Sequence, residues 1–304
     1  MSGLFPRQVV EPITRHEAHV HEVVEVLAHG RTAVQSYEIV RLGGYGRAMV
    51  IEGRVQSTEA DEAIYHEALL LPAFVHAPRA ERVLCLGGAN GGMLPRIRAL
   101  TEVREVVQVD VDRELYERSV EFLPHMHGDA RPDPRCRVLF GDPRQVASTL
   151  PGRFDLVLAD LPDSVDGTHV PRMFTAEFYG ELSALLADGG VFATQAGPAN
   201  PLDPTFLASV LRTARSVFRH AAAYTVSVPA FGIPWAFVVA SDGVDPATLT
   251  AEDFHRRMAL VEPGAARTYD WETHRHMFAL PRPLREALTG NGRIIRDSEP
   301  LSVP

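Results

Sequence analysis

An alternation of strand-like and helix-like segments between residues 82 and 241 most constrains what this chain can fold into. Short apolar runs are followed by segments whose apolar residues recur at helical spacing. The expected strands cover residues 82–88, 103–112, 136–142, 154–161 and 191–197, the expected helices cover residues 92–100, 113–123, 144–150, 175–190 and 204–218, and two strand-like runs end at Ser241. Such alternation is typical of parallel strands joined by crossover helices. It predicts an α/β fold with a Rossmann-like, methyltransferase-type doubly wound sheet and a closing hairpin.

The flanking segments predict two smaller units. Residues 19–28, 36–42 and 48–56 are typical of antiparallel strands separated by turns, and residues 58–75 have the apolar spacing of a helix. Short helical pieces at 251–260 and 280–290 follow a polar, Pro-containing stretch. We expect an N-terminal β-strand domain (1–57), a Rossmann-like nucleoside-binding catalytic domain (58–241), and a C-terminal helical appendage with a tail (242–304).

Charge and hydropathy exclude several classes of partner. The formal net charge of −9 argues against nucleic acid, because backbone binding needs a basic footprint. No apolar run reaches the roughly 18 residues of a membrane span, and residues 1–10 lack a signal pattern. These features predict a cytoplasmic protein with no membrane contact. Cys85 and Cys136 lie in apolar strand-like runs, which favours core thiols over a disulfide.

A nucleoside site is indicated between the first two strands of the main domain. The glycine-rich run GGANGG, from Gly87 to Gly92, lies between a predicted strand and a predicted helix, where glycines let the backbone approach a ligand. Asp110 ends the next strand, where an acidic residue accepts hydrogen bonds from ribose hydroxyls. Asp142 follows the third strand and fits either a helix N-cap or a ligand to the adenine amine.

Two carboxylates mark the end of the fourth predicted strand. Asp160 and Asp163, in ADLPDS, face the crevice where open α/β sheets bind ligands. Neighbouring carboxylates repel each other, and a cation between them relieves this repulsion. An amine substrate therefore explains the pair better than a structural ion pair does.

These motifs together resemble the polyamine aminopropyltransferases, the spermidine synthase family, from about Thr32 to Ser241. The segment IEGRVQSTEADEAIYHEALL is similar to the family's entry segment, with Gln56 in its VQ and Tyr65, His66 and Glu67 in its YHE. GGANGG stands where the family has GGGDGG, and VDVD stands where the family has an acidic residue, a small apolar residue and Asp.

The resemblance implies a set of site residues. Asp110 would hold the ribose and Asp142 the adenine amine, while Gln35, Gln56 and the glycine-rich loop would lie near the sulfonium nucleoside. Asp160 would accept a proton, Tyr65 would orient the attacking nitrogen, and Asp163 would join them. The expected donor-binding residues are Gln35, Gln56, Gly87, Gly88, Asn90, Gly91, Asp110 and Asp142, and the expected acceptor-binding residues are His66, Asp163 and Phe231.

The family reaction implied by the resemblance is attack by a neutral amine on the aminopropyl carbon beside the sulfonium, which releases methylthioadenosine. The co-substrate would be decarboxylated S-adenosylmethionine or S-adenosylmethionine, and the acceptor a small-molecule amine or polyamine. The resemblance also suggests a homodimer or a larger homo-oligomer.

Three departures from the family pattern keep alternatives open. Asn90 replaces an Asp that would pair with the donor's ammonium, so a methyl or aminocarboxypropyl transferase that uses intact S-adenosylmethionine is a same-fold alternative. Phe231 in VPAFG replaces a Tyr that would touch the amine. Pro143 replaces a common Gly but leaves Asp142 in place. A nucleoside-binding pseudoenzyme is the alternative from a different class.

A metal centre is not expected. Three close histidine pairs occur, at residues 19 and 21, 125 and 127, and 274 and 276, but no third ligand is evident beside any of them.

Overall fold

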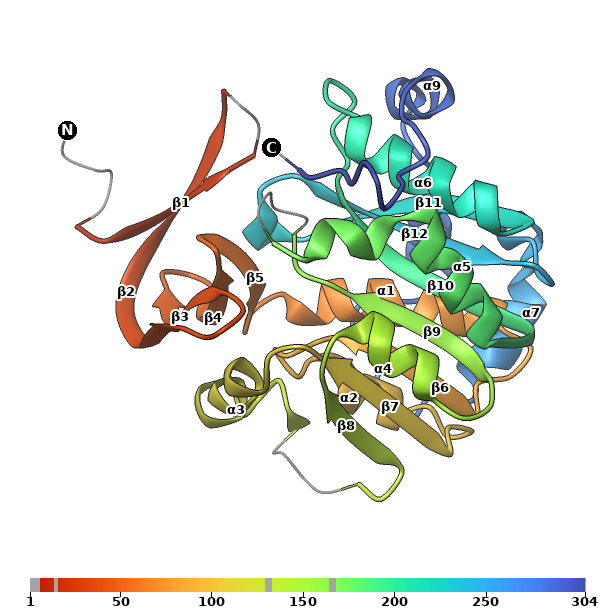
Figure 1. The fold of residues 1–304 in the computed structure, drawn as a ribbon, viewed down its shortest axis with the longest axis horizontal. Coiled ribbons are helices and arrows are strands. Elements are labelled where there is room, and N and C mark those ends of the chain that lie inside the picture. Colours follow the sequence, from red (N-terminus) through yellow and green to blue (C-terminus); the bar gives the residue numbers. More distant parts are fainter. Residues whose placement is uncertain (1–5, 14–15, 129–132, 164–167, 304) are drawn as a thin grey trace.

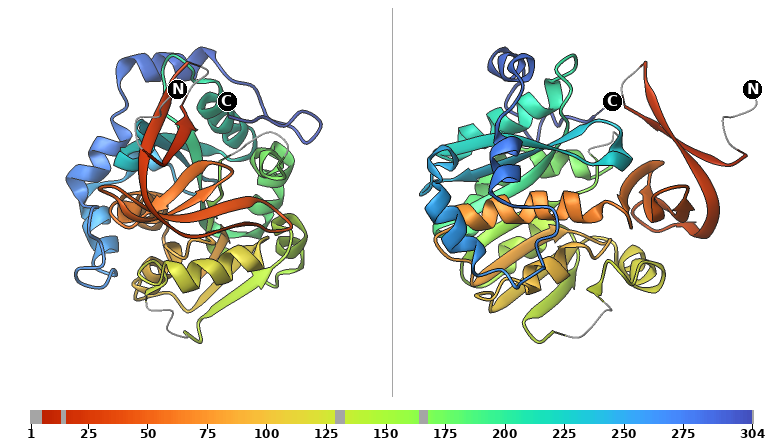
Figure 2. Two further views of the ribbon diagram at one scale, coloured as in Figure 1. Left: turned by 90° about the vertical axis from the view of Figure 1, so that its left-hand side faces the viewer. Right: turned by 180° about the vertical axis from the view of Figure 1, so that it is seen from behind.

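The computed structural model describes residues 6–13, 16–128, 133–163 and 168–303 and contains two sheets (Figure 1). The first is a purely antiparallel N-terminal sheet with strands in sequence order. Its strands are β1 (Gln8–Pro12), β2 (Ala18–Arg31), β3 (Ser36–Leu42), β4 (Gly46–Ile51) and β5 (Arg54–Thr58). The long β1–β2 hairpin projects from the body of the molecule (Figure 2).

The second sheet has the order β11-β12-β10-β9-β6-β7-β8. Strands β10, β9, β6, β7 and β8 run parallel, and the hairpin β11–β12 closes one edge antiparallel to β10. Its strands are β6 (Arg82–Gly87), β7 (Glu105–Asp110), β8 (Cys136–Phe140), β9 (Phe154–Asp160), β10 (Leu186–Pro198), β11 (His220–Ser227) and β12 (Pro234–Ser241). The predicted doubly wound α/β sheet with its N-terminal β-sheet is confirmed.

Helices cover both faces of this sheet (Figure 1). They are α1 (Glu62–His76), α2 (Met93–Arg98), α3 (Arg113–Phe122), α4 (Pro143–Thr149), α5 (Ala176–Leu185), α6 (Thr205–Val217), α7 (Ala251–Met258), α8 (Trp271–Phe278) and α9 (Arg282–Gly290). Helix α1 packs on β9 to β12 together with α2 and α7, while α5 and α6 pack on the opposite face. This arrangement leaves the carboxyl ends of β6, β7 and β9 facing the N-terminal sheet.

Helix α1 is buried on nearly all sides, and only Ile64 among its residues is not buried. A buried helix that carries polar side chains must provide each of them with a partner. Glu67 accepts hydrogen bonds from the backbone N–H groups of Arg267 and Thr268, at 2.8 to 3.0 Å. The His76 ring lies between the carbonyl oxygens of Pro72 and Pro246. Helix α1 thereby joins the entry segment to the C-terminal region.

The C-terminal region shares the main core. Phe254, Tyr269 and Met277 belong to the same apolar cluster as α1 and the inner strands. The division of the chain at residues 57 and 241 therefore stays a prediction rather than an observed boundary.

Three element assignments differ from the sequence-based expectation. The sequence pattern predicts neither the short edge strand β1 nor helix α8, whose polar sequence hides the packing of Met277 on the core. The helix expected over 175–190 ends at Leu185, and β10 begins at Leu186, because Leu186 already pairs with Phe154 of β9. Pairing along a central strand thus overrides the helical spacing of this segment.

Candidate active site

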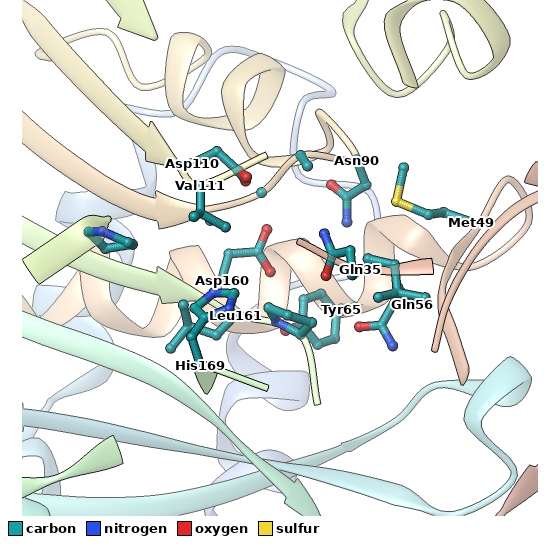
Figure 3. A pocket seen from close by; sticks show the side chains of 16 residues that line it. Gln35, Met49, Gln56, Tyr65, Asn90, Asp110, Val111, Asp160, Leu161 and His169 are labelled. Carbon is teal, nitrogen blue, oxygen red and sulfur yellow. The ribbon is translucent and has the colours of Figure 1, made fainter. Parts of the chain in front are cut away.

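A pocket lies at the carboxyl ends of β6, β7 and β9, and β4, β5 and the turn before β3 line it from the N-terminal sheet (Figure 3). The residues that line it come from both sheets, from α1 and from the loops that follow the strands. Eight predicted site residues are among them: Gln35, Gln56, Tyr65, Gly87, Gly88, Asn90, Asp110 and Asp160. Five lie outside the lining: His66, Gly91, Asp142, Asp163 and Phe231.

The glycines of the glycine-rich loop are needed for the packing of the protein itself, in addition to leaving space for a ligand. Gly87, Gly88 and Gly91 all have φ between 82° and 86°, a conformation that side chains rarely adopt. A Cβ on Gly87 would collide with the Asp160 carbonyl oxygen, and one on Gly91 would collide with the His127 ring. The loop therefore fits closely between β9 and the residues behind it.

Asp110 ends β7 and is buried at the edge of the pocket, where its Oδ1 accepts a hydrogen bond of 2.9 Å from the Asp112 N–H. Burial raises the pKa of Asp110 to about 7, although backbone hydrogen bonds from Asp112 and Ala89 oppose this shift. Its position is consistent with the expected contact to a ribose.

Asp112, the second acidic residue of VDVD, is a site residue that the sequence reasoning leaves without a role. Its Oδ2 accepts a hydrogen bond from the Gln35 Nε2, at 3.1 Å, and from the Thr32 hydroxyl, at 2.6 Å. A carboxylate is an acceptor, so the Gln35 amide is held with its nitrogen toward Asp112 and its Oε1 free for the pocket. The VDVD motif could have drawn attention to Asp112, but Gln35, to which Asp112 is hydrogen-bonded, lies 77 residues away in the sequence.

Asn90 uses one end of its amide inside its own loop. The Asn90 Oδ1 accepts a hydrogen bond of 2.9 Å from the Gly92 N–H. The end left for the pocket is the amide nitrogen, which points toward Gln35 in Figure 3. Asn90 can therefore present a hydrogen-bond donor where the family has a carboxylate.

Asp142 is the N-cap of α4, and its Oδ1 accepts a hydrogen bond of 2.9 Å from the Arg144 N–H. This is the capping arrangement that the sequence allows, and its neighbour Pro143 lines the pocket. The second Asp142 oxygen leaves the adenine contact open, and that contact stays a prediction.

Asp160 ends β9 and points into the middle of the pocket (Figure 3). The Tyr65 hydroxyl lies close enough to its carboxyl group for each to affect the pKa of the other. Burial raises the pKa of Asp160, while the charge of His66 and the Tyr65 hydroxyl oppose the shift. Burial and the charge of Asp160 likewise raise the pKa of Tyr65, so Tyr65 is a neutral hydrogen-bond donor.

Asp163 lies behind the pocket wall beside a cation of the protein itself. The Asp163 Oδ2 is 3.6 Å from the Arg54 Nη1, and both side chains are nearly buried. Burial raises the pKa of Asp163 to about 6, and the charge of Arg54 opposes this. Glu11 of β1 is buried in the same region, and burial together with the charge of Asp163 raises its pKa to about 8. Arg54 and Glu11 are site neighbours that the sequence pattern does not reveal.

Phe231 stands at the end of η3 (Pro229–Phe231) and packs edge-on against Tyr65, at 5.9 Å between ring centroids, and against Trp235, at 4.8 Å. The Asp61 carboxylate accepts a hydrogen bond of 2.7 Å from the Ala230 N–H and so anchors this turn to the start of α1. An aromatic wall thus stands where a tyrosine hydroxyl is expected.

His66 lies one layer behind the pocket. Its side chain is 0% exposed, and the Gly92 Cα packs against its ring so closely that a Cβ there would collide. His66 therefore faces Asp160 rather than the open pocket.

Within the described ranges no group of three or more potential metal ligands occurs, and no helix there is long and apolar enough to cross a bilayer. The sheet topology and the pocket at the carboxyl ends of its central strands define a Rossmann-like α/β protein with a ligand site at the strand ends. Comparison with known proteins narrows this class.

The family described as "Spermine/spermidine synthase domain" matches residues 62–250. A polyamine aminopropyltransferase 2 from Hyperthermus butylicus is 35% identical over 298 residues, which cover 98% of this chain and 97% of that protein. A polyamine aminopropyltransferase from Sulfurisphaera tokodaii is 32% identical and covers 97% of each chain. A crystal structure of spermidine synthase in complex with the transition-state analogue AdoDATO superposes with a TM-score of 0.82 at 24% identity, over 93% of this chain and 94% of that one. The chain belongs to the spermine/spermidine synthase family.

Proposed function

We propose that this enzyme transfers an aminopropyl group from decarboxylated S-adenosylmethionine to the nitrogen of a small amine or polyamine and releases methylthioadenosine. The observation that carries the proposal is one pocket with two differently equipped halves. The donor half consists of Gly87, Gly88, Asn90 and Asp110. The acceptor half consists of Tyr65 and Asp160 in the pocket, with Asp163 and Phe231 behind them.

Each half supplies the chemistry that its part of the reaction needs. Asp110 would accept hydrogen bonds from the ribose, and the carboxylates of Asp110 and Asp160 would attract a sulfonium between them. Tyr65 would orient the acceptor nitrogen, and Asp160 would take its proton, which leaves a lone pair to attack the carbon beside sulfur. The C–S bond would then break, and its electron pair would neutralise the sulfonium.

The side-chain amides of Gln35 and Asn90 are the groups that would meet the amino-acid-derived end of the sulfonium donor. Decarboxylated S-adenosylmethionine ends in an ammonium, and the Gln35 Oε1 is an acceptor available for it, because the Gln35 nitrogen is held by Asp112. Asn90 supports a second candidate, since its free amide nitrogen suits a carboxylate. That candidate is methyl or aminocarboxypropyl transfer from intact S-adenosylmethionine.

We also propose a cytoplasmic location and a homodimer or larger homo-oligomer. Gln56, Gly91 and Asp142 are assigned to the donor side. His66, Asp163 and Phe231 are assigned to the acceptor side.

Amine-dependent release of methylthioadenosine tests the proposal. The enzyme is incubated with decarboxylated S-adenosylmethionine, with and without each of a panel of diamines and triamines, and the nucleoside is quantified by chromatography. We expect release only when an amine is present. Release that does not depend on any amine, or no release with the whole panel, would refute the proposed transfer.

A further inference from the structure

Two buried polar atoms face each other behind the acceptor half. The His66 Nε2 and the Asp160 Oδ2 lie 3.9 Å apart, and neither atom has a hydrogen-bond partner among the described residues. A buried polar atom without a hydrogen-bond partner costs free energy, so each such atom in a folded protein needs an explanation. Asp160 is also the only one of the pair that reaches the pocket.

The other side of the His66 ring is firmly held. The His66 Nδ1 is 2.9 Å from the Glu62 Oε2, one helical turn earlier on α1. The Glu62 Oε1 in turn accepts a hydrogen bond of 2.7 Å from the Arg96 Nη2. Burial alone would raise the pKa of Glu62, but the hydrogen bonds and charges of His66 and Arg96 lower it to about 2.

An ionised Glu62 fixes the tautomer of His66. A carboxylate can only accept, so the Nδ1 carries a hydrogen, and the neutral ring directs its Nε2 lone pair at Asp160. A lone pair and an ionised carboxylate repel each other unless a proton lies between them. One proton, on Asp160 or on His66, would remove this repulsion and draw the two atoms from 3.9 Å into hydrogen-bonding distance.

The proposed reaction produces one such proton in every turnover. The acceptor enters as an ammonium and gives one proton to the Asp160 carboxylate. Its nitrogen then forms the bond to the aminopropyl carbon, the C–S bond breaks, and its electron pair stays on sulfur. The product amine keeps the remaining two hydrogens and a positive charge, so Asp160 is left protonated and must be deprotonated before the next cycle.

We propose that His66, oriented by Glu62, is a positioning and proton-relay residue that takes this proton from Asp160. This inference rests on the proposed function, in which Asp160 is the first proton acceptor. The Nε2 receives the proton, and the resulting imidazolium donates its Nδ1–H to Glu62 until it releases a proton on that side.

The charges around the dyad suit this transfer. Asp160 regains its negative charge as His66 becomes positive, so the net charge of the group that also includes Glu62 and Arg96 does not change. His66 would then release a proton to solvent on its Glu62 side, where the Glu62 Oε1 is 4.0 Å from the Arg267 Nη1 and the Arg267 side chain is 63% exposed. The titratable and charged groups on the elements packed around His66 are Glu62, Tyr65, Cys85, Arg96 and Asp160.

His66→Gln tests the relay, because glutamine keeps a polar group at this position but cannot carry a proton. We expect turnover to fall at least about tenfold, with methylthioadenosine affinity within about twofold of the wild type. The acid limb of the kcat/KM profile should also move to higher pH, because a proton held on His66 stabilises the ionised form of Asp160 and lowers its pKa, and glutamine cannot hold that proton. His76→Gln is the matched control, since His76 is buried on the same helix and, among the described residues, its ring nitrogens bond to backbone carbonyls.

Glu62→Gln provides the second variant if His66→Gln does not fold. It leaves the imidazole in place and removes the charge that stabilises its cation, so we expect a smaller loss of turnover and a shift of the acid limb in the same direction. Unchanged turnover and an unchanged pH profile in a folded His66→Gln or Glu62→Gln enzyme would overturn the relay. An inactive wild-type enzyme would instead refute the proposed function.

Discussion

The donor and acceptor halves of the pocket are assembled in different ways. Most of the donor half is local, because Gly87, Gly88 and Asn90 form one loop and Asp110 ends the adjacent strand, while Gln35 and Gln56 reach it from the N-terminal segment. The acceptor half collects side chains from α1, from β9 and the loop after it, and from η3, with Glu11 and Arg54 of the N-terminal sheet against them. On the proposed assignment, a largely local motif would bind the donor, whereas a distributed set of residues would bind the acceptor and could change without disturbing the donor.

Asp160→Asn should separate the two halves most clearly. Asparagine fills the same volume but cannot accept a proton, so we expect turnover to fall by about 100-fold or more, within the usual range for loss of a general base. Methylthioadenosine should still bind within about twofold, as measured by calorimetry. Equal losses of turnover and of nucleoside affinity would show that Asp160 belongs to the donor half as well.

Asp110→Asn is the corresponding test of the donor half. Loss of a charged hydrogen-bond acceptor should weaken methylthioadenosine binding by about 1 to 3 kcal/mol. The free energy of unfolding, by contrast, should be higher in this variant than in the wild type above about pH 7. The pKa of Asp110 is about 7 in the folded protein and near the ordinary 3.8 in the unfolded chain, so its ionisation lowers the free energy of unfolding as pH rises from about 4 to 7.

The ligand-free Asp110→Asn variant should therefore have a higher Tm than the wild type at pH 8 and a similar Tm at pH 4. Calorimetry without ligand measures both values. Unchanged nucleoside affinity would remove Asp110 from the ribose contact. An identical difference in Tm at both pH values would contradict the burial of an ionisable carboxyl group.

Much of the donor half could be predicted from the sequence, because its residues are contiguous or follow from the strand order. GGANGG and VDVD each lie at the end of a predicted strand, and parallel strands bring such ends together. The interaction of Gln35 with Asp112 could not be predicted, because it joins residues 77 positions apart.

The acceptor half was predicted less completely for the same physical reason. The strand pattern identifies Asp160 and Asp163, and the family resemblance adds Tyr65, but Arg54 reaches Asp163 only through the packing of β5 over the main sheet. Similarly, the start of β10 depends on its pairing with β9, which the helical spacing of residues 175–190 does not reveal.

Asn90→Asp sharpens the comparison inside the donor half. If the donor carries an ammonium and no carboxylate, the new charge should improve its binding by about 1 kcal/mol in a partly solvated site. Intact S-adenosylmethionine should bind less well to the same variant, because its carboxylate would face the new one. Affinities of both donors for both enzymes give a double difference. A value of zero would show that Asn90 does not face the donor tail.

Phe231→Tyr should have the smallest effect. Phe231 packs against Tyr65 and Trp235, so the added hydroxyl should be accommodated at the aromatic wall and offer one more polar contact to the acceptor. We expect KM for a diamine to fall about twofold to threefold, the effect of one modest hydrogen bond, with KM for the donor unchanged. A change confined to the donor KM would place Phe231 on the other half.

The identity of the transferred group tests the central claim most directly. The enzyme receives equal amounts of decarboxylated and intact S-adenosylmethionine with one diamine in the same tube, and the amine products are identified by mass. The account predicts an aminopropylated amine, with methylthioadenosine formed in equal amount. A methylated or aminocarboxypropylated amine, or no modified amine at all, would contradict it.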